Sequence, residues 1–207
     1  MHTFCHALPG TWHQMGVILA ASDALNWYAR LVGQDAATLT GELGPLRAPG
    51  KTTFLPYLGG ERTPLNSASI RGAFTGLEHA TDRAAGTRAV LEGVAFAFRD
   101  SRDALAATGT KLTHVLAVGG GAKSDYWLRT IATALNCPIQ LPVAGDFGGA
   151  FGAARLAIMA ATGAGAEIAT LPKIARQIDP DPALTDAFDV GHSRYRAAQS
   201  AIKGLTS

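Results

Sequence analysis

The segment HVLAVGGGAKSDYWLRTIATAL, residues 114–135, constrains the fold more than any other part of the sequence. An apolar run typical of a buried strand meets three consecutive glycines, and the residues that follow have the spacing of an amphipathic helix. Glycine is costly to order and brings no side chain to a core, so it is used where the backbone needs positive φ or where another group approaches closely. The segment therefore predicts a strand, a tight turn and a helix.

Two interpretations of the glycines at 119–121 are open. A strand that leads into a helix gathers backbone N–H groups and a helix N-terminus at one place, which favours a phosphate, and the missing Cβ atoms leave space for a flat ring. The same glycines also suit a tight turn with no ligand. Their spacing excludes the dinucleotide fingerprint G-x-G-x-x-G, and no acidic residue closes a following strand.

A second glycine-containing motif is misleading. Gly50-Lys51-Thr52 matches the end of a Walker A motif, but Pro45 occupies the place of the required earlier glycine. The motif should also follow a strand and begin a helix, whereas here it follows a proline-rich loop and precedes a β-like run. We do not expect a working P-loop.

Other polar residues allow weaker hypotheses. Ser22 and Asn26 are four residues apart on a predicted helix, so they share a face, either as part of a site or as a solvent-facing patch. Glu61 and Arg62 are charges within an otherwise apolar loop, and they either reach a site or pair with each other. His2 and His6 flank Cys5, but no second cluster completes four ligands, so a zinc site is not expected.

The composition is that of a globular chain with a real core. Hydrophobic residues make up 47% and charged residues 16% of 207 residues, which is enough for one large domain or two small ones. A net charge of +2 without a basic cluster indicates neither a nucleic acid nor a membrane partner. Cys5 and Cys137 are far apart and form no disulfide framework, and the N-terminus has no secretory signal, so we expect a cytoplasmic protein.

Helical and strand patterns alternate along the chain, which predicts an α/β or α+β fold, with too few strands for a complete sheet of this length. Thr81 or Asp82 is the expected N-cap of the strongest helix, and Gly109 its C-terminal glycine. The expected elements are a helix at 12–33, a loop at 39–51, an ordered loop at 52–74, helices at 80–109 and 148–163, a strand-turn-helix unit at 114–136, a strand at 138–143, and a polar, proline-containing tail ending in an amphipathic stretch.

Several blocks of sequence together resemble a known family. In colinear order from His2 to about Ala161, the chain is similar to the second half of the FGGY carbohydrate kinases, and within them most similar to the xylulokinases. One block departs from the family's second signature at Ala85 and Gly86, where the pattern expects a polar or acidic residue and then an aliphatic one. The blocks are FCHALPGTWH, FLPYLGGERTP, GAFTGL with RAVLEGVAFAFRD, and VGGGAKSDYWLRTIATALNCPI followed by GGAFGAARLA.

The resemblance implies a fold, a cofactor and a set of site residues. Residues 1–207 would form the ribonuclease-H-like, actin-like C-terminal kinase domain, incomplete at its N-terminal strands, which binds ATP with Mg²⁺. Asp125 stands where related kinases carry an adenine-contacting Asn, and it can accept a hydrogen bond from an amine but cannot donate one. The residues expected at the nucleotide are Gly119, Gly120, Gly121, Ala122, Asp125, Ser22 and Asn26.

The resemblance also implies that other parts are needed for activity. The family's catalytic Asp and its phosphate-binding Gly-Thr turn precede the matched blocks, as does its N-terminal sugar-binding domain, so none of them lies in this sequence. We therefore expect transfer of the ATP γ-phosphate to D-xylulose only when that other half is present, and an isolated chain that is inactive and self-associates. The alternative is a non-catalytic kinase remnant, or a module that binds a nucleotide or a protein partner.

Overall fold

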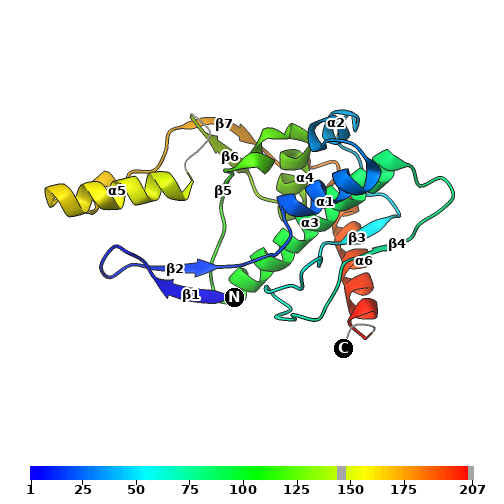
Figure 1. The fold of residues 1–207 in the computed structure, drawn as a ribbon, viewed down its shortest axis with the longest axis horizontal. Coiled ribbons are helices and arrows are strands. Elements are labelled where there is room, and N and C mark those ends of the chain that lie inside the picture. Colours follow the sequence, from blue (N-terminus) through cyan, green and yellow to red (C-terminus); the bar gives the residue numbers. More distant parts are fainter. Residues whose placement is uncertain (144–147, 205–207) are drawn as a thin grey trace.

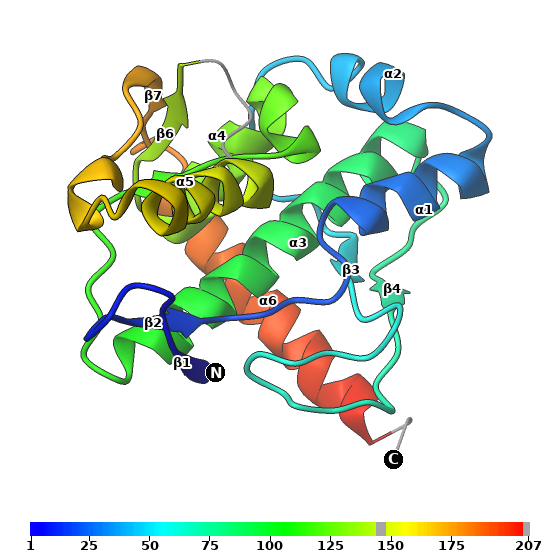
Figure 2. The ribbon, with the colours of Figure 1, turned by 60° about the vertical axis from the view of Figure 1, so that its left-hand side comes forward.

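The computed structural model describes residues 1–143 and 148–204, and one long helix, α3 (Arg83–Ala106), runs through its centre (Figure 1). Figure 2 shows other helices placed around α3. The elements that contact α3 are α1 (Ser22–Val32), α2 (Ala36–Gly41), α4 (Asp125–Leu135), α6 (Thr185–Lys203) and β3 (Thr53–Leu55).

The N-terminus of α3 is capped by Asp82, whose side chain accepts a hydrogen bond of 2.7 Å from the backbone N–H of Ala85. This confirms one of the two predicted caps, while Thr81 instead accepts a bond from the backbone N–H of Glu78. Gly109, beyond the helix end, has a φ of +90°, which glycine adopts without strain.

Gly86, where the sequence departs from the family signature, lets α1 approach α3. A Cβ placed on Gly86 would lie 2.1 Å from the hydroxyl oxygen of Tyr28 on α1. That hydroxyl donates to the carbonyl of Arg83 at 3.3 Å. The missing side chain therefore allows a tyrosine to pack on the central helix.

The strands form three small sheets. In the described residues no sheet has more than three strands, which agrees with the small number of strands expected from the sequence. Two sheets are antiparallel pairs: β1 (His2–Cys5) with β2 (Trp12–Met15), and β3 with β4 (Ala73–Thr75). In the third sheet the middle strand is β6 (Ile139–Pro142), which pairs in parallel with β5 (Val115–Leu116) and antiparallel with β7 (Ile174–Ile178).

The predicted helix at 12–33 is wrong in its first part. Trp12 to Met15 form a strand that pairs with the N-terminal strand in the register Cys5↔Trp12, and the helix begins only at Ser22. The apolar spacing suits a helix, but pairing with the preceding strand through a turn at Gly10, with a φ of +69°, determines the local structure. The predicted loop at 39–51 is also partly helical, because the short helix α2 begins at Ala36 and ends at Gly41, inside that range.

The C-terminal segment is more ordered than the sequence predicts. The expected polar tail contains a strand, β7, in which Ile178 is buried against Leu128, Ala132 and Ile139. The amphipathic stretch expected at the end of this tail forms the helix α6. The predicted strand at 138–143 and helix at 148–163 are confirmed as β6 and α5 (Gly149–Thr162).

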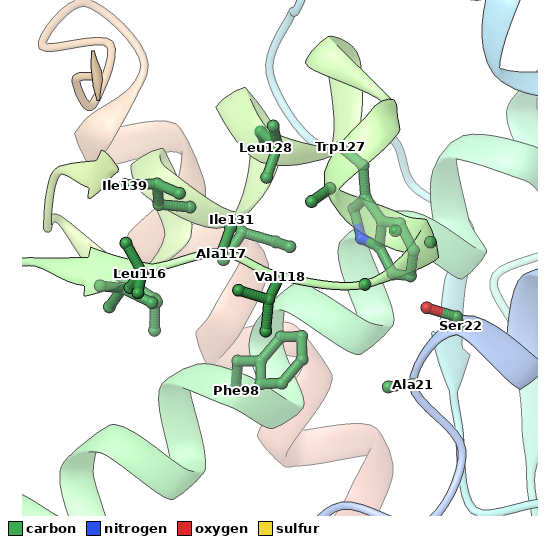
Figure 3. A pocket seen from close by; sticks show the side chains of 16 residues that line it. Ala21, Ser22, Phe98, Leu116, Ala117, Val118, Trp127, Leu128, Ile131 and Ile139 are labelled. Atoms are coloured by element: carbon green, nitrogen blue, oxygen red, sulfur yellow. The ribbon is translucent and has the colours of Figure 1, made fainter. Parts of the chain in front are cut away.

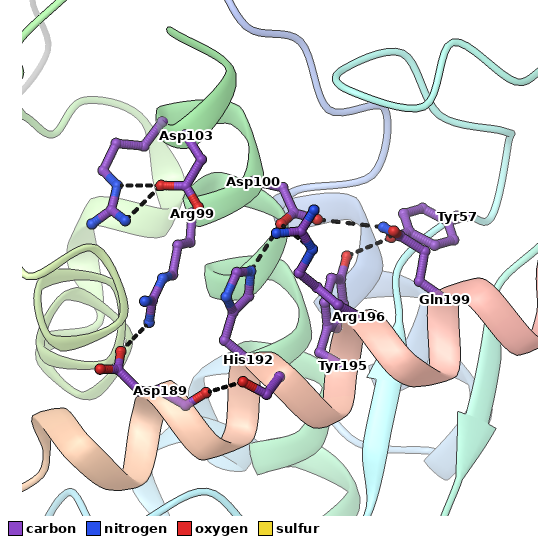
Figure 4. Close-up of polar contacts among 11 residues, drawn as sticks. Tyr57, Arg99, Asp100, Asp103, Asp189, His192, Tyr195, Arg196 and Gln199 are labelled. Carbon is purple, nitrogen blue, oxygen red and sulfur yellow. Dashed lines mark hydrogen bonds and ion pairs between the residues drawn. The ribbon is translucent and has the colours of Figure 1, made fainter. Parts of the chain in front are cut away.

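A buried polar network holds α6 against α3 and the segment that follows β3 (Figure 4). The hydroxyls of Tyr57 and Tyr195 are 2.7 Å apart, and the Gln199 amide donates to the Tyr57 hydroxyl at 2.6 Å. Asp100 lies 2.8 Å from the Nε2 atom of His192 and accepts from Gln199 at 3.3 Å. Each of these polar groups is therefore matched by another inside the core, as burial requires.

The helix α5 differs from the other described α-helices because none of its residues is buried. It projects from one end of the molecule and contacts the short 3-10 helix η2 (Ala166–Ile168) (Figure 1). None of the described helices is both long enough and apolar enough to cross a bilayer.

Candidate functional site

The predicted strand-turn-helix unit is confirmed at residues 115–135. Between β5 and α4 the chain forms a 3-10 turn, η1 (Gly120–Lys123), which is preceded by Gly119 with a φ of +88°. The Ser124 side chain caps α4 by accepting a hydrogen bond of 3.3 Å from the backbone N–H of Trp127. The first N–H groups of a helix have no partners within it and carry a partial positive charge, so this turn is suited to an anion.

A cavity of about 340 Å³ opens beside the turn (Figure 3). This volume is within the range of small-molecule sites. One end is formed by the glycine turn with Ala21, Ser22 and Trp127, and the other by apolar side chains of α3, α4, β5 and β6. The apolar lining consists of Phe98, Val115, Leu116, Ala117, Val118, Leu128, Ile131, Leu135 and Ile139.

The glycines of the turn have different surroundings. A Cβ on Gly120 would meet no atom within 4 Å, so this position faces open space. A Cβ on Gly121 would lie 2.9 Å from the Trp127 ring and 3.0 Å from the Ser22 hydroxyl. The close neighbours of Gly121 are thus side chains of the protein itself. Position 119 favours glycine because its backbone has a positive φ.

The structure brings together only part of the expected set of site residues. Ser22 lines the cavity with Gly119, Gly120, Gly121 and Ala122. Asn26 shares an exposed face of α1 with Ser22, as predicted, but it lines a separate shallow hollow with Gly33, Gln34, Asp35 and Ala36.

Asp125, the first residue of α4, is not among the residues that line the cavity. Both of its carboxylate oxygens accept hydrogen bonds from the guanidinium of Arg176 on β7, one of them at 2.8 Å. These bonds, more than any other cause, hold the pKa of the Asp125 carboxyl below its usual value. Sequence analysis missed this pair because β7 lies in the segment expected to be a polar tail.

Hydrogen bonds from backbone N–H groups show what Glu61, in the charged pair Glu61 and Arg62, does in the structure. Glu61 is buried, and its Oε1 atom accepts hydrogen bonds from the backbone N–H of Leu19 at 3.1 Å and of Arg62 at 2.7 Å. Burial, the main cause, raises the pKa of Glu61 to about 7, against an opposing effect of these two bonds. Glu61 therefore holds the segment that precedes Ser22, a role that two neighbouring charges within an apolar loop do not reveal.

One cluster in the described residues has the spacing of a metal site. Ligand atoms of Asp100, Asp103 and His192 lie within 4.8 Å of one another. Asp100 is already bonded to His192 and Gln199, and Asp103 accepts two hydrogen bonds from Arg102, at 2.6 and 3.0 Å. The cluster is thus accounted for as a hydrogen-bonding network at the contact between α3 and α6.

The family follows from comparison with known proteins. Residues 1–161 match the C-terminal domain of the FGGY family of carbohydrate kinases. The chain belongs to this family. FGGY kinases have a C-terminal domain with the ribonuclease-H-like, actin-like fold, so the fold class predicted from the sequence is confirmed.

Individual FGGY relatives are similar over most of the chain. The xylulose kinase of Escherichia coli (strain K12) is 41% identical over 176 residues, which covers 84% of this chain and 36% of that protein. A crystal structure of a xylulose kinase from Brucella ovis is 60% identical with a TM-score of 0.93, and one from Rhodospirillum rubrum is 30% identical with a TM-score of 0.79. Each alignment covers 99% of this chain and 43% of the other, so the chain spans less than half the length of these relatives.

Proposed function

We propose that this chain is the nucleotide-binding part of a sugar kinase that transfers the γ-phosphate of ATP to D-xylulose. The observation that carries the proposal is the cavity beside the glycine turn, where the bare backbone of Gly119–Gly121 and Trp127 in the first turn of α4 meet an apolar pocket. The xylulose kinases among the relatives support the choice of sugar. Because the chain spans less than half of their length, we assign to it only the binding of the nucleotide.

The chemistry of the lining fits a nucleotide. The N–H groups at the start of η1 and α4 suit phosphate oxygens, and the open space at Gly120 allows a ring to lie against the main chain. The Ser22 hydroxyl can donate to a ribose or phosphate oxygen. Asp125 would contact the base only after leaving Arg176, and Asn26, on the same face of α1 as Ser22, would act from the separate hollow that it lines.

ATP in phosphoryl transfer is accompanied by Mg²⁺, which neutralises charge on the phosphates. The lining of the cavity includes no carboxylate among the described residues, so we assign no metal ligand to them. The metal would therefore be held by the phosphates and by groups outside this lining.

Gly120 provides the decisive test. Because a Cβ there meets nothing within 4 Å, Gly120→Val should leave the fold intact while its methyl groups occupy the space for the ring. Calorimetric titration should show ATP binding by the wild-type chain and a loss of about tenfold or more for the variant, with an unchanged unfolding midpoint. Unchanged affinity would mean that the glycines only make a turn, which leaves the alternative of a kinase remnant or partner-binding module.

The inactivity of the isolated chain stays a prediction. Phosphoryl transfer needs a positioned acceptor and a base as well as the nucleotide. A coupled assay of ADP release with xylulose tests it, and turnover at an ordinary kinase rate by the purified chain would contradict it.

A further inference from the structure

The start of α1 is not held by a local cap. Ala21 occupies the N-cap position and makes no side-chain cap bond, although this end of the helix places Ala21 and Ser22 in the wall of the cavity. A helix end without a cap must be held by other contacts if its position is to be fixed.

Those contacts come from the loop GGERTP, more than forty residues away in the sequence. The backbone N–H of Leu19 donates to Oε1 of Glu61 at 3.1 Å, and that of Val17 donates to the Thr63 hydroxyl at 3.0 Å. The backbone N–H of Thr63 in turn donates to the carbonyl of Val17 at 2.9 Å. Glu61 and Thr63 together therefore make three bonds to residues 17–19.

The loop itself is rigidly placed. Glu61 and Thr63 are only 3% and 1% exposed, and Glu61 exchanges two backbone hydrogen bonds of 2.8 Å with Ser67. On the other side of the segment, Gly16 lies close to α3, because a Cβ there would be 3.1 Å from Cβ of Ser101. Residues 16–21 are thus held between α3 and the loop.

We propose that Glu61 and Thr63 are positioning residues for the cavity, holding residues 17–21 so that Ser22 faces the glycine turn at the distance that ligand binding requires. The proposal rests on the assignment of this cavity to ATP. The Ser22 hydroxyl lies 3.0 Å from the place of a Cβ on Gly121, so a small shift of the segment alters the cavity wall directly.

Three variants separate positioning from general stability. Thr63→Val removes the hydroxyl without a change of shape, and Glu61→Ala removes the carboxylate. Glu61→Gln retains the Oε1 oxygen that accepts both backbone bonds, while the Oε2 atom that it replaces has no hydrogen-bond partner among the described residues. It is therefore the conservative variant that should restore function.

The matched control is Thr133→Val. The Thr133 hydroxyl also accepts a bond from a distant backbone N–H, that of Asp181 at 3.1 Å and 48 residues away, compared with 46 residues for Thr63. The Thr133 hydroxyl also donates to the Arg129 carbonyl at 2.8 Å, so the control removes a comparable long-range bond and one bond within α4 while residues 17–21 keep their contacts.

Amide hydrogen exchange of the 207-residue chain without ligand provides the first measurement. Exchange at Val17 and Leu19 should become faster by about tenfold in Thr63→Val and Glu61→Ala, and stay near the wild-type rate in Glu61→Gln and Thr133→Val. Unchanged exchange in the first two variants would overturn the proposal whether or not the chain binds ATP.

Calorimetric titration with ATP provides the second measurement. We expect affinity to fall about five- to tenfold in Thr63→Val and Glu61→Ala and to be retained in Glu61→Gln and Thr133→Val. Faster exchange with unchanged affinity would overturn the positioning role alone. Absence of ATP binding by the wild-type chain would instead overturn the proposed function.

Discussion

At the scale of single residues, the two neighbouring glycines Gly120 and Gly121 should respond differently to an added methyl group. Gly121→Ala places a Cβ 2.9 Å from the Trp127 ring, which is closer than a real contact allows, so the turn or the ring must shift. We expect a loss of about 1–3 kcal/mol in the free energy of unfolding, measured with urea. Gly120→Ala is the control, and an equal loss in both variants would contradict the geometry described for Gly121.

Glu92 on α3 should make stability depend on pH. Burial raises its pKa to about 8 from a usual value of 4.5, against the opposing charge of Arg88. The folded chain thus holds a proton that the unfolded chain releases, so this contribution to stability is complete below pH 4.5 and is lost as the pH rises through about 8.

Glu92→Gln imitates the protonated form at every pH. It should stabilise the chain by about 1–3 kcal/mol above pH 8 and have little effect below pH 4.5. Urea unfolding of both chains at the two extremes of pH checks this. A variant that is less stable at high pH would show that attraction to Arg88 outweighs burial.

At the scale of elements, the cap of α3 gives a clear expectation because this helix contacts most of the others. Asp82→Ala removes the bond to the backbone N–H of Ala85 and should cost about 1 kcal/mol of unfolding free energy. Asp82→Asn retains the capping oxygen and should cost much less. Equal losses in the two variants would mean that charge, rather than the cap bond, is what Asp82 contributes.

The sequence predicts an element well where its signal is local. The cap of α3 and the strand-turn-helix unit around Gly119 depend on neighbouring residues, and both are confirmed. The hairpin at Trp12 and the strand ending at Ile178 depend on pairing with other segments, so periodicity alone misassigned them. For the same reason, the sequence alone does not reveal the role of Glu61, whose backbone partner Leu19 is 42 residues away.

At the scale of the whole molecule, we expect the chain to self-associate. Among the described residues, β5 lies at the end of its sheet, paired on one side with β6, and Leu116 on β5 is 37% exposed. An open strand edge with apolar residues recruits other strands. Light scattering should show a mass that rises with concentration, and Leu116→Lys should reduce the effect. A clean monomer over a wide range of concentration would contradict this prediction.

The exposure of α5 has a consequence for how the chain is cut by proteases. A helix of 14 residues with nothing buried depends on its own helix–coil balance, which is marginal at this length in water. Arg155, midway along α5, bonds to the Thr170 carbonyl at 2.7 Å and stacks on Phe151. These local contacts therefore set how often this part of α5 unfolds and exposes the Arg155 peptide bond to a protease. Trypsin should therefore cleave at Arg155 at a rate set by the local opening of α5 and its contact with Thr170, while the rest of the molecule stays folded. Any molecule that covers α5 would reveal itself by slowing that single cut.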